Sequence, residues 1–252
     1  MRSGTLFGVG VGPGDPELMT LKAVRVLRES RVVAHFAKRG KIGNALATAQ
    51  QHIAPDAEQL PLYYPYTTEL SPRDPEYVRA MRTFYEDSAE RIAQRLRDGI
   101  DVAVLCEGDP MFYGSYMYVH DRLAQRFQSR VIAGITSFAG CAAGARIPLV
   151  STNRVFSVVP GTLREEDLEE KLRGADAAAI IKLGRHYKKV RRVLDRLGRS
   201  ETAMYFENGT TERELAIPLR DKTDDRSIYF ALIILPGHDG GPYANWDEVG
   251  LT

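Results

Sequence analysis

Short apolar runs alternate with amphipathic stretches along the first part of the chain. Runs typical of buried strands cover residues 5–11, 31–36, 101–106 and 130–133. Apolar positions three and four residues apart predict helices over residues 16–30, 42–53 and 75–97, and a helix of small residues extends to Ala145. Because strands alternate with helices, the pattern predicts a largely parallel sheet that is covered on both faces.

The alternation pauses near residues 148–153 and then starts again. Strands are predicted over residues 155–159, 177–183, 202–206 and 227–235, and helices over residues 165–173 and 187–197. The last strands are separated only by a turn, so this half is expected to contain a mixed sheet. We therefore predict two α/β domains, 1–150 and 151–252. The tail from Gly237 is rich in glycine, aspartate and proline and is expected to be loose.

The composition is that of an ordinary globular protein, with 44% hydrophobic and 27% charged residues in 252. Basic and acidic residues balance, 34 against 33, so no overall field would attract nucleic acid or an anionic membrane. The longest clean apolar run, residues 229–235, is far shorter than the roughly 20 residues that span a bilayer. With no signal-peptide pattern at the start, we expect neither export nor membrane insertion.

The two cysteines, Cys106 and Cys141, lie in apolar surroundings and form no CxxC pair. The five histidines are scattered, with no HxxxH or HExxH spacing. We therefore expect no disulfide and no metal site, and a reducing cytoplasm fits the cysteine usage best.

A glycine-rich turn, residues 8–16, follows the first predicted strand. It fails the dinucleotide pattern GxGxxG, because Asp15 or Pro13 stands where the third glycine should be, depending on the starting residue. Proline also removes an amide that a phosphate would bind, and no GKS or GKT follows. An NAD-dependent oxidoreductase is thus disfavoured. A tight turn without any ligand stays an open alternative.

Four further segments follow predicted strands: residues 107–114, 133–137, 182–189 and 207–214. In an open parallel sheet, ligands bind beyond the carboxyl ends of the strands, so the first of these segments should face the same crevice as the glycine-rich turn. Each has a simpler interpretation as well. These are an Asp-Pro turn, a helix cap at Thr136 or Ser137, a solvated basic helix face and a hairpin loop.

In this order and at these separations, the five segments resemble the tetrapyrrole methylase family, the corrin and sirohaem methyltransferases, from about Thr5 to Pro236. Within the family, residues 9–23, 107–118 and 182–186 are most similar to precorrin-2 C20-methyltransferases. One position departs from the family pattern, because Ala133 stands where a proline is usual. The backbone path of that loop is therefore less constrained.

The resemblance implies two α/β domains with the cofactor cleft between them, and a homodimer. It also implies an S-adenosylmethionine-dependent C-methyltransferase that converts precorrin-2 to precorrin-3A in cobalamin biosynthesis and releases S-adenosylhomocysteine, without a metal. The cofactor-binding residues that it implies are Pro13, Glu107, Gly108, Asp109, Phe112, Thr136, Ser137, Leu183, Gly209 and Ala231.

For the tetrapyrrole substrate, the expected contacts are Tyr113 and Tyr116, which would share a helix face, whereas Tyr118 would lie in the core. Arg185 is expected to meet a substrate carboxylate, although solvent exposure is its simpler interpretation. Asp109 and Tyr113 are the nearest candidates for a base, and none is assigned. Methylation of another ring carbon, a cobalt-loaded substrate and a non-enzymatic tetrapyrrole carrier remain alternatives.

Overall fold

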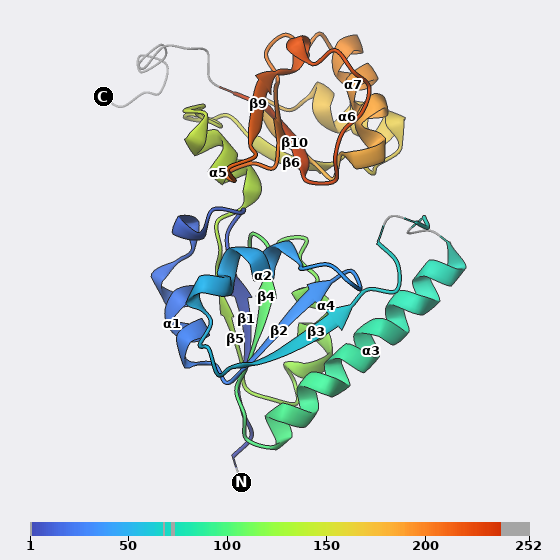
Figure 1. Ribbon diagram of the computed structural model, residues 1–252. Helices are drawn as coiled ribbons and strands as arrows, with labels where there is room; N and C mark the ends of the chain where they lie inside the picture. The colour runs from blue at the N-terminus through green and yellow to red at the C-terminus, as the bar shows by residue number, and fades with distance from the viewer. Residues whose placement is uncertain (1, 68, 72–73, 238–252) are drawn as a thin grey trace. The chain divides into compact units, whose positions relative to one another are not determined.

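The computed structural model describes residues 2–67, 69–71 and 74–237 (Figure 1). The chain divides into two compact units, of which the first ends at Thr136 and the second begins at Ser137. Each unit contains one five-stranded sheet. The α/β class with two domains, predicted from the sequence, is confirmed.

The first unit is built on a fully parallel sheet with the strand order β3-β2-β4-β1-β5. Its strands are β1 (Leu6–Gly10), β2 (Val32–Ala37), β3 (Glu58–Tyr63), β4 (Val102–Cys106) and β5 (Ser129–Ile132). Its helices are the 3₁₀ turns η1 (Pro16–Leu18) and η2 (Gln50–His52) and the α-helices α1 (Leu21–Glu29), α2 (Asn44–Ala49), α3 (Pro75–Arg97) and α4 (Tyr116–Leu123). The predicted parallel sheet is confirmed.

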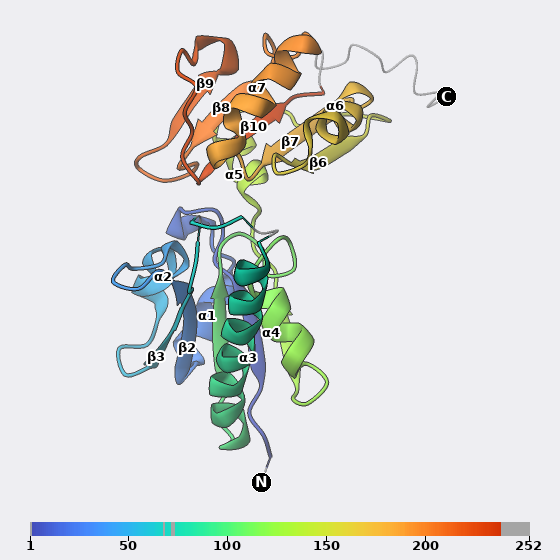
Figure 2. The ribbon, with the colours of Figure 1, turned by 90° about the vertical axis from the view of Figure 1, so that its right-hand side faces the viewer.

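Helices cover both faces of this sheet. Successive side chains of a strand point to opposite faces, so Val104 and Cys106 of β4 pack with α3 and α4, while Ala103 and Leu105 pack with α1 and α2. Helices α3 and α4 lie side by side (Figure 2). Burial on both faces explains why β4 is apolar throughout, as strands of parallel sheets usually are.

The central strand β1 contains a glycine because an aromatic ring occupies the space beside it. A Cβ added at Gly8 would lie 2.3 Å from the ring of Tyr116. Tyr116 is fully buried, and its hydroxyl lies 3.2 Å from the Ser129 hydroxyl of β5. The first turn of α4 is thus packed directly onto the sheet.

Two local features differ from the expected pattern. The predicted helix over residues 16–30 is divided, because Asp15 caps η1 and Thr20 caps α1. Strand β3 lies at the sheet edge and contains Pro61, which weakens the sequence signal for a strand and left it unpredicted.

The second unit has a mixed sheet with the order β6-β7-β10-β8-β9, in which only β6 and β7 pair in parallel. The strands are β6 (Phe156–Pro160), β7 (Ala177–Ile181), β8 (Met204–Glu207), β9 (Leu215–Pro218) and β10 (Ala231–Leu235). The helices are α5 (Ser137–Gly144), α6 (Glu165–Arg173), η3 (Gly184–His186), α7 (Tyr187–Arg196) and η4 (Leu219–Asp221). The mixed sheet is confirmed, whereas the short strand β9 was not predicted.

Helices α6 and α7 lie side by side, and together with the sheet they form the main core of this unit (Figures 1 and 2). Helix α5 contacts β10, and its Cys141 packs against Gly209, where an added Cβ would lie 2.2 Å from the sulfur. This packing ties α5 to the second unit. The division therefore falls before α5 and not at the predicted segment 148–153.

The expected loose tail lies outside the described residues, apart from Gly237. None of the helices within residues 2–67, 69–71 and 74–237 has the length and apolarity that crossing a bilayer requires.

We predict that Gly8→Ala will destabilise the protein by about 1–3 kcal/mol, because the new methyl group collides with the buried Tyr116 ring. Urea unfolding will measure this cost, with Gly174→Ala as the control, since nothing lies within 4 Å of a Cβ there. Combining Gly8→Ala with Tyr116→Leu should cost less than the sum of the two single changes. Simple additivity would contradict the collision.

Candidate functional site

The loops that follow β1 and β4 lie against each other. The amide of Val11 donates to the carbonyl of Cys106 over 3.0 Å. Gly12 and Gly108 then exchange a pair of backbone hydrogen bonds, of 3.4 and 2.8 Å. The two loops therefore meet beyond the carboxyl ends of β1 and β4, where a shared crevice is expected from the sequence.

Asp109 joins the third loop, residues 133–136, to this pair. Its carboxylate accepts one hydrogen bond from the amide of Met111, at 2.9 Å, and one from the amide of Gly134, at 3.0 Å. Each carboxylate oxygen therefore has a backbone donor. This arrangement favours a structural role for Asp109 over that of a catalytic base.

The backbones of the three loops approach too closely to leave room for side chains. An added Cβ at Gly134 would lie 2.0 Å from the carbonyl oxygen of Gly108, and one at Gly10 would lie 2.7 Å from the same oxygen. Gly134 was not among the predicted site residues. The signal for it was present, because it is a glycine two residues after a strand.

Gly108 itself has φ +62, a left-handed conformation that glycine adopts freely. The nearest atoms to an added Cβ are the Ile135 carbonyl oxygen and the Thr136 Cα, at 3.8 and 3.9 Å. The backbone angle at position 108 therefore favours glycine. No protein atom occupies the space where a Cβ would lie.

Glu107 begins the β4 loop beside helix α2. Burial raises the pKa of its carboxyl to about 7, against the opposing effect of a hydrogen bond from the Ala45 amide, although part of the residue reaches solvent. A raised pKa makes this carboxyl a better hydrogen-bond donor than an ordinary surface glutamate.

The expected arrangement of the tyrosines is wrong. Tyr116 is fully buried against β1, whereas Tyr118 is 48% exposed and its ring lies 4.6 Å from that of Tyr85. Tyr113 is 45% exposed, with φ 55. Helix α4 begins only at Tyr116, so Tyr113 lies in a turn, and helical spacing does not place it on the same face as Tyr116. Tyr116 is therefore a core residue.

In the second unit, Leu183, Gly209 and Ala231 all lie at the same end of the sheet, where strands begin or finish. Strands β7 and β8 finish at this end and β10 begins there, since Ala231 pairs with Glu207. The side chains of Leu183 and Ala231 are buried. A ligand at this end would therefore meet their main chain.

Left-handed backbone angles gather in the predicted segments. Within the described part of the chain, six residues other than glycine have positive φ, and four of them belong to these segments: Tyr113, Lys182, Asn208 and Thr210. Such conformations cost about 1–3 kcal/mol each and are found preferentially at functional sites. Their distribution supports binding roles for these strand-end turns.

Arg185 lies exposed in η3, at the same end of the sheet as Leu183. It forms no ion pair with any residue that the structure describes, whereas Arg192 and Arg196 of α7 pair with Glu165. Its charge is thus available to an anionic ligand.

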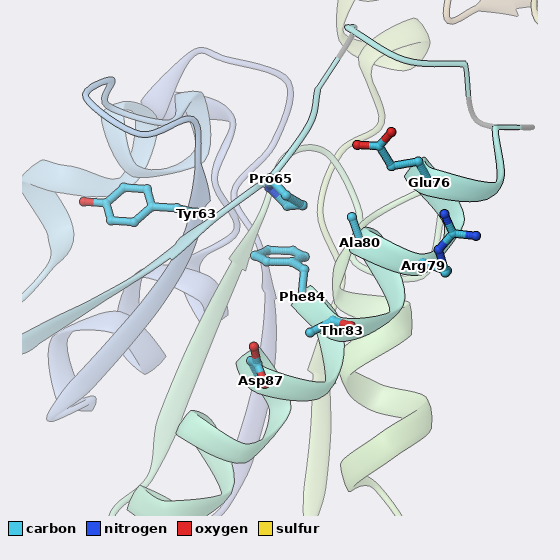
Figure 3. A pocket seen from close by; sticks show the side chains of 8 residues that line it. All are labelled: Tyr63, Pro65, Glu76, Arg79, Ala80, Thr83, Phe84 and Asp87. Carbon is cyan, nitrogen blue, oxygen red and sulfur yellow. The ribbon is translucent and has the colours of Figure 1, made fainter.

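A separate hollow of about 530 Å³ lies between the end of β3 and the first half of α3 (Figure 3). It is lined by Tyr63, Pro65, Glu76, Arg79, Ala80, Thr83, Phe84 and Asp87, none of which is a predicted site residue. Two carboxylates against one guanidinium suit a polycarboxylate ligand poorly.

Neither cysteine is suited to nucleophilic catalysis. Both thiols are free and buried, and burial raises the pKa of Cys106 to about 11 and that of Cys141 to about 12. Among the residues that the structure describes, no three His, Cys, Asp or Glu side chains gather to hold a metal ion.

The parallel sheet with interlocked glycine loops, followed by a mixed-sheet unit, defines a two-unit α/β protein with glycine-rich and left-handed turns at its strand ends. The chain belongs to the Tetrapyrrole (Corrin/Porphyrin) Methylases, whose family model matches residues 5–221.

The chain is 48% identical to a precorrin-2 C(20)-methyltransferase of Sinorhizobium sp, over 95% of this chain and 98% of that protein. It is 43% identical to the cobalamin biosynthesis protein CobIJ of Mycobacterium tuberculosis, over 93% of this chain but only 46% of that longer protein. Its fold is similar to that of the uroporphyrin-III C-methyl transferase from Thermus thermophilus complexed with S-adenyl homocysteine. The TM-score is 0.63 and the identity 23%, with 92% of each chain covered.

We predict that Asp109→Ala will release the amides of Met111 and Gly134 and destabilise the protein by about 1 kcal/mol or more. Hydrogen exchange should show faster exchange at these two amides and unchanged protection at Val104 of β4. Asp109→Asn keeps only one acceptor oxygen, so it should release one of the two amides. Unaltered exchange in Asp109→Ala would contradict the role of the carboxylate.

Proposed function

We propose that this protein transfers a methyl group from S-adenosylmethionine to carbon 20 of precorrin-2, yielding precorrin-3A in cobalamin biosynthesis. The observation that carries the proposal is the near full-length similarity to the Sinorhizobium enzyme, together with membership of the methylase family. The interlocked loops of the first unit and the strained turns of the second support it, since both are suited to holding a ligand through the main chain.

The strand-end residues of each unit contribute to S-adenosylmethionine binding in this proposal. In the first unit these are Pro13, Glu107, Gly108, Asp109, Phe112, Thr136 and, at the start of the second, Ser137. Leu183, Gly209 and Ala231 contribute from the second sheet. Asp109 acts by fixing the loops, Gly108 offers backbone without a side chain in the way, and Gly209 lets the turn after β8 pack against Cys141.

The main contribution that this reaction requires from the protein is to position the substrate carbon next to the methyl group. Methyl transfer from a sulfonium is an in-line displacement in which the leaving group departs as a neutral thioether, so neither a protein nucleophile nor a metal is required. Holding the reacting carbon about 3–3.5 Å from the methyl group can contribute roughly 7–11 kcal/mol. The proton lost from the methylated carbon needs an acceptor, and Tyr113 stays a candidate because Asp109 is engaged by two amides.

Tyr113 and Arg185 are the proposed substrate contacts. Tyr113 offers an exposed ring next to the Gly-Asp-Pro turn. Arg185 offers a guanidinium, whose forked donors suit the carboxylates of the macrocycle. Tyr116 is not included, because it is buried in the core.

We also propose a homodimer in a reducing cytoplasm. Family resemblance supports the dimer, and two free buried thiols are compatible with a reducing compartment. Light scattering at micromolar concentration should give twice the 28.1 kDa of one chain.

The decisive experiment incubates the protein with methyl-labelled S-adenosylmethionine and either metal-free or cobalt-loaded precorrin-2. We expect NMR to locate the label at carbon 20 of the metal-free product. Label at another carbon would contradict the proposed methylation position. Transfer only to the cobalt-loaded ring would contradict the metal-free substrate. Absence of any transfer, with a tetrapyrrole still bound, would favour a carrier.

We predict that Gly108→Val will reduce the affinity for S-adenosylhomocysteine at least tenfold in calorimetry, because a branched side chain would stand between the β4 loop and the cofactor. Gly40→Val is the matched control, since Gly40 has φ +76 but nothing within 4 Å of an added Cβ. The Gly40→Val variant has the same kind of backbone strain as Gly108→Val, but at a position that is not proposed to contact the cofactor. Equal affinities of the two variants would remove Gly108 from the cofactor site.

We predict that Arg185→Ala will raise the KM for the tetrapyrrole about tenfold, through loss of one charge-assisted pair, and leave S-adenosylhomocysteine affinity unchanged. Steady-state kinetics will measure this, with Arg192→Ala as the control because Arg192 already pairs with Glu165. An unchanged KM would show that Arg185 faces solvent during catalysis.

A further inference from the structure

The turn after β8 has an unusual backbone conformation. Asn208 and Thr210 have φ values of 47 and 66, on either side of Gly209. On one side the turn is supported locally, because the Thr211 hydroxyl donates to the Asn208 carbonyl over 2.7 Å and the amide of Thr210 donates to the Glu214 carboxylate. Strained turns of this kind persist only where their surroundings fix them.

The other support lies at Glu207, the last residue of β8. Its side chain is only 19% exposed, and its carboxylate accepts a hydrogen bond from the Tyr205 hydroxyl. Burial, and then the hydrogen bond to Glu207, raise the pKa of Tyr205, so its hydroxyl stays protonated and able to donate. A carboxylate in this position still requires a positive charge.

Lys222 supplies that charge from the segment after η4. Its side chain is 6% exposed, and its ammonium nitrogen lies 3.9 Å from Glu207 and 3.1 Å from Asp224. The same nitrogen lies 4.7 Å from the centre of the Tyr205 ring and 5.3 Å from that of Tyr187. Lysine is almost never buried without partners, and here the partners fix its position.

We propose that Lys222 is a positioning residue for cofactor binding, which holds the strained Asn208–Gly209–Thr210 turn in place through Glu207. The proposal rests on the proposed function, in which Gly209 meets S-adenosylmethionine. Lys222 does not touch the cofactor and takes no part in methyl transfer. It maintains the end of β8, from which the turn projects.

Removal of the ammonium group leaves the largely enclosed Glu207 carboxylate without its cation. The carboxylate then gains free energy by turning toward water, and this movement displaces the residue that leads into the turn. Cofactor affinity falls because the bound conformation of the turn must be restored on binding. Once the cofactor is bound, the rate of methyl transfer is preserved.

The test compares Lys222→Met with Arg220→Met. Both remove a cation from neighbouring positions, but Arg220 is exposed and its ion-pair partners are Glu201, at 3.8 Å, and Asp221, at 3.9 Å, rather than Glu207. We expect Lys222→Met to weaken S-adenosylhomocysteine binding about tenfold in calorimetry. It should raise the KM for S-adenosylmethionine by a similar factor and leave kcat within about twofold. Arg220→Met should match the wild type.

A second change separates charge compensation from packing. Adding Glu207→Gln to Lys222→Met removes the unpaired carboxylate while an amide oxygen still accepts from Tyr205. We expect the double variant to recover S-adenosylhomocysteine affinity to within about threefold of the wild type. Failure of this rescue, or a Lys222→Met protein that binds as Arg220→Met does, overturns the proposal.

Tyr205→Phe serves if Lys222→Met does not fold. It keeps the ring beside the ammonium group and removes the hydroxyl, which donates to Glu207 and also lies 2.8 Å from the Ser227 hydroxyl. A loss of affinity of about threefold is expected, and an unchanged affinity overturns the proposal. Wild-type protein that binds no S-adenosylhomocysteine would instead defeat the proposed function. The two failures are therefore distinguishable.

Discussion

Direct contact between backbone segments at the carboxyl edge of the parallel sheet is the constraint on which the first unit depends. Gly10, Gly108 and Gly134 approach so closely that side chains at Gly10 and Gly134 would collide with main-chain atoms. The Asp109 carboxylate connects two of these loops, because it accepts one hydrogen bond from an amide of its own loop and one from an amide of the loop after β5. Three loops that are distant in sequence thereby become one rigid surface of peptide groups.

The strand-end turns of the second unit are also fixed in place, but by different contacts. They contain left-handed residues other than glycine, and hydrogen bonds involving Thr211 and Glu214 support the turn after β8. Around Glu207, a tyrosine hydroxyl and the Lys222 ammonium group compensate a carboxylate that burial alone would disfavour. Cys141 of α5 fills the space beside Gly209, so the turn is also fixed by packing.

Such surfaces suit a methyl donor with a good leaving group. Because the donor sulfur departs neutral, the protein need not supply a nucleophile, and the raised pKa values of Cys106 and Cys141 keep both thiols protonated. Orientation of the reacting groups can then account for much of the rate of such a transfer. The residues that hold the loops therefore matter as much as those that touch a ligand.

The sequence alone determined the alternation of strands and helices, the mixed second sheet and the five strand-end segments, because periodicity and glycine patterns are local properties. The ends of α3 and α6 were predicted to the residue. Tertiary structure decided what depends on contacts between distant residues. Tyr116 is buried because Gly8 of β1 leaves space for its ring, while Tyr118 projects outward. Helix α5 joins the second unit because it packs on β10, and Lys222 acquires its role only where folding brings it beside Glu207.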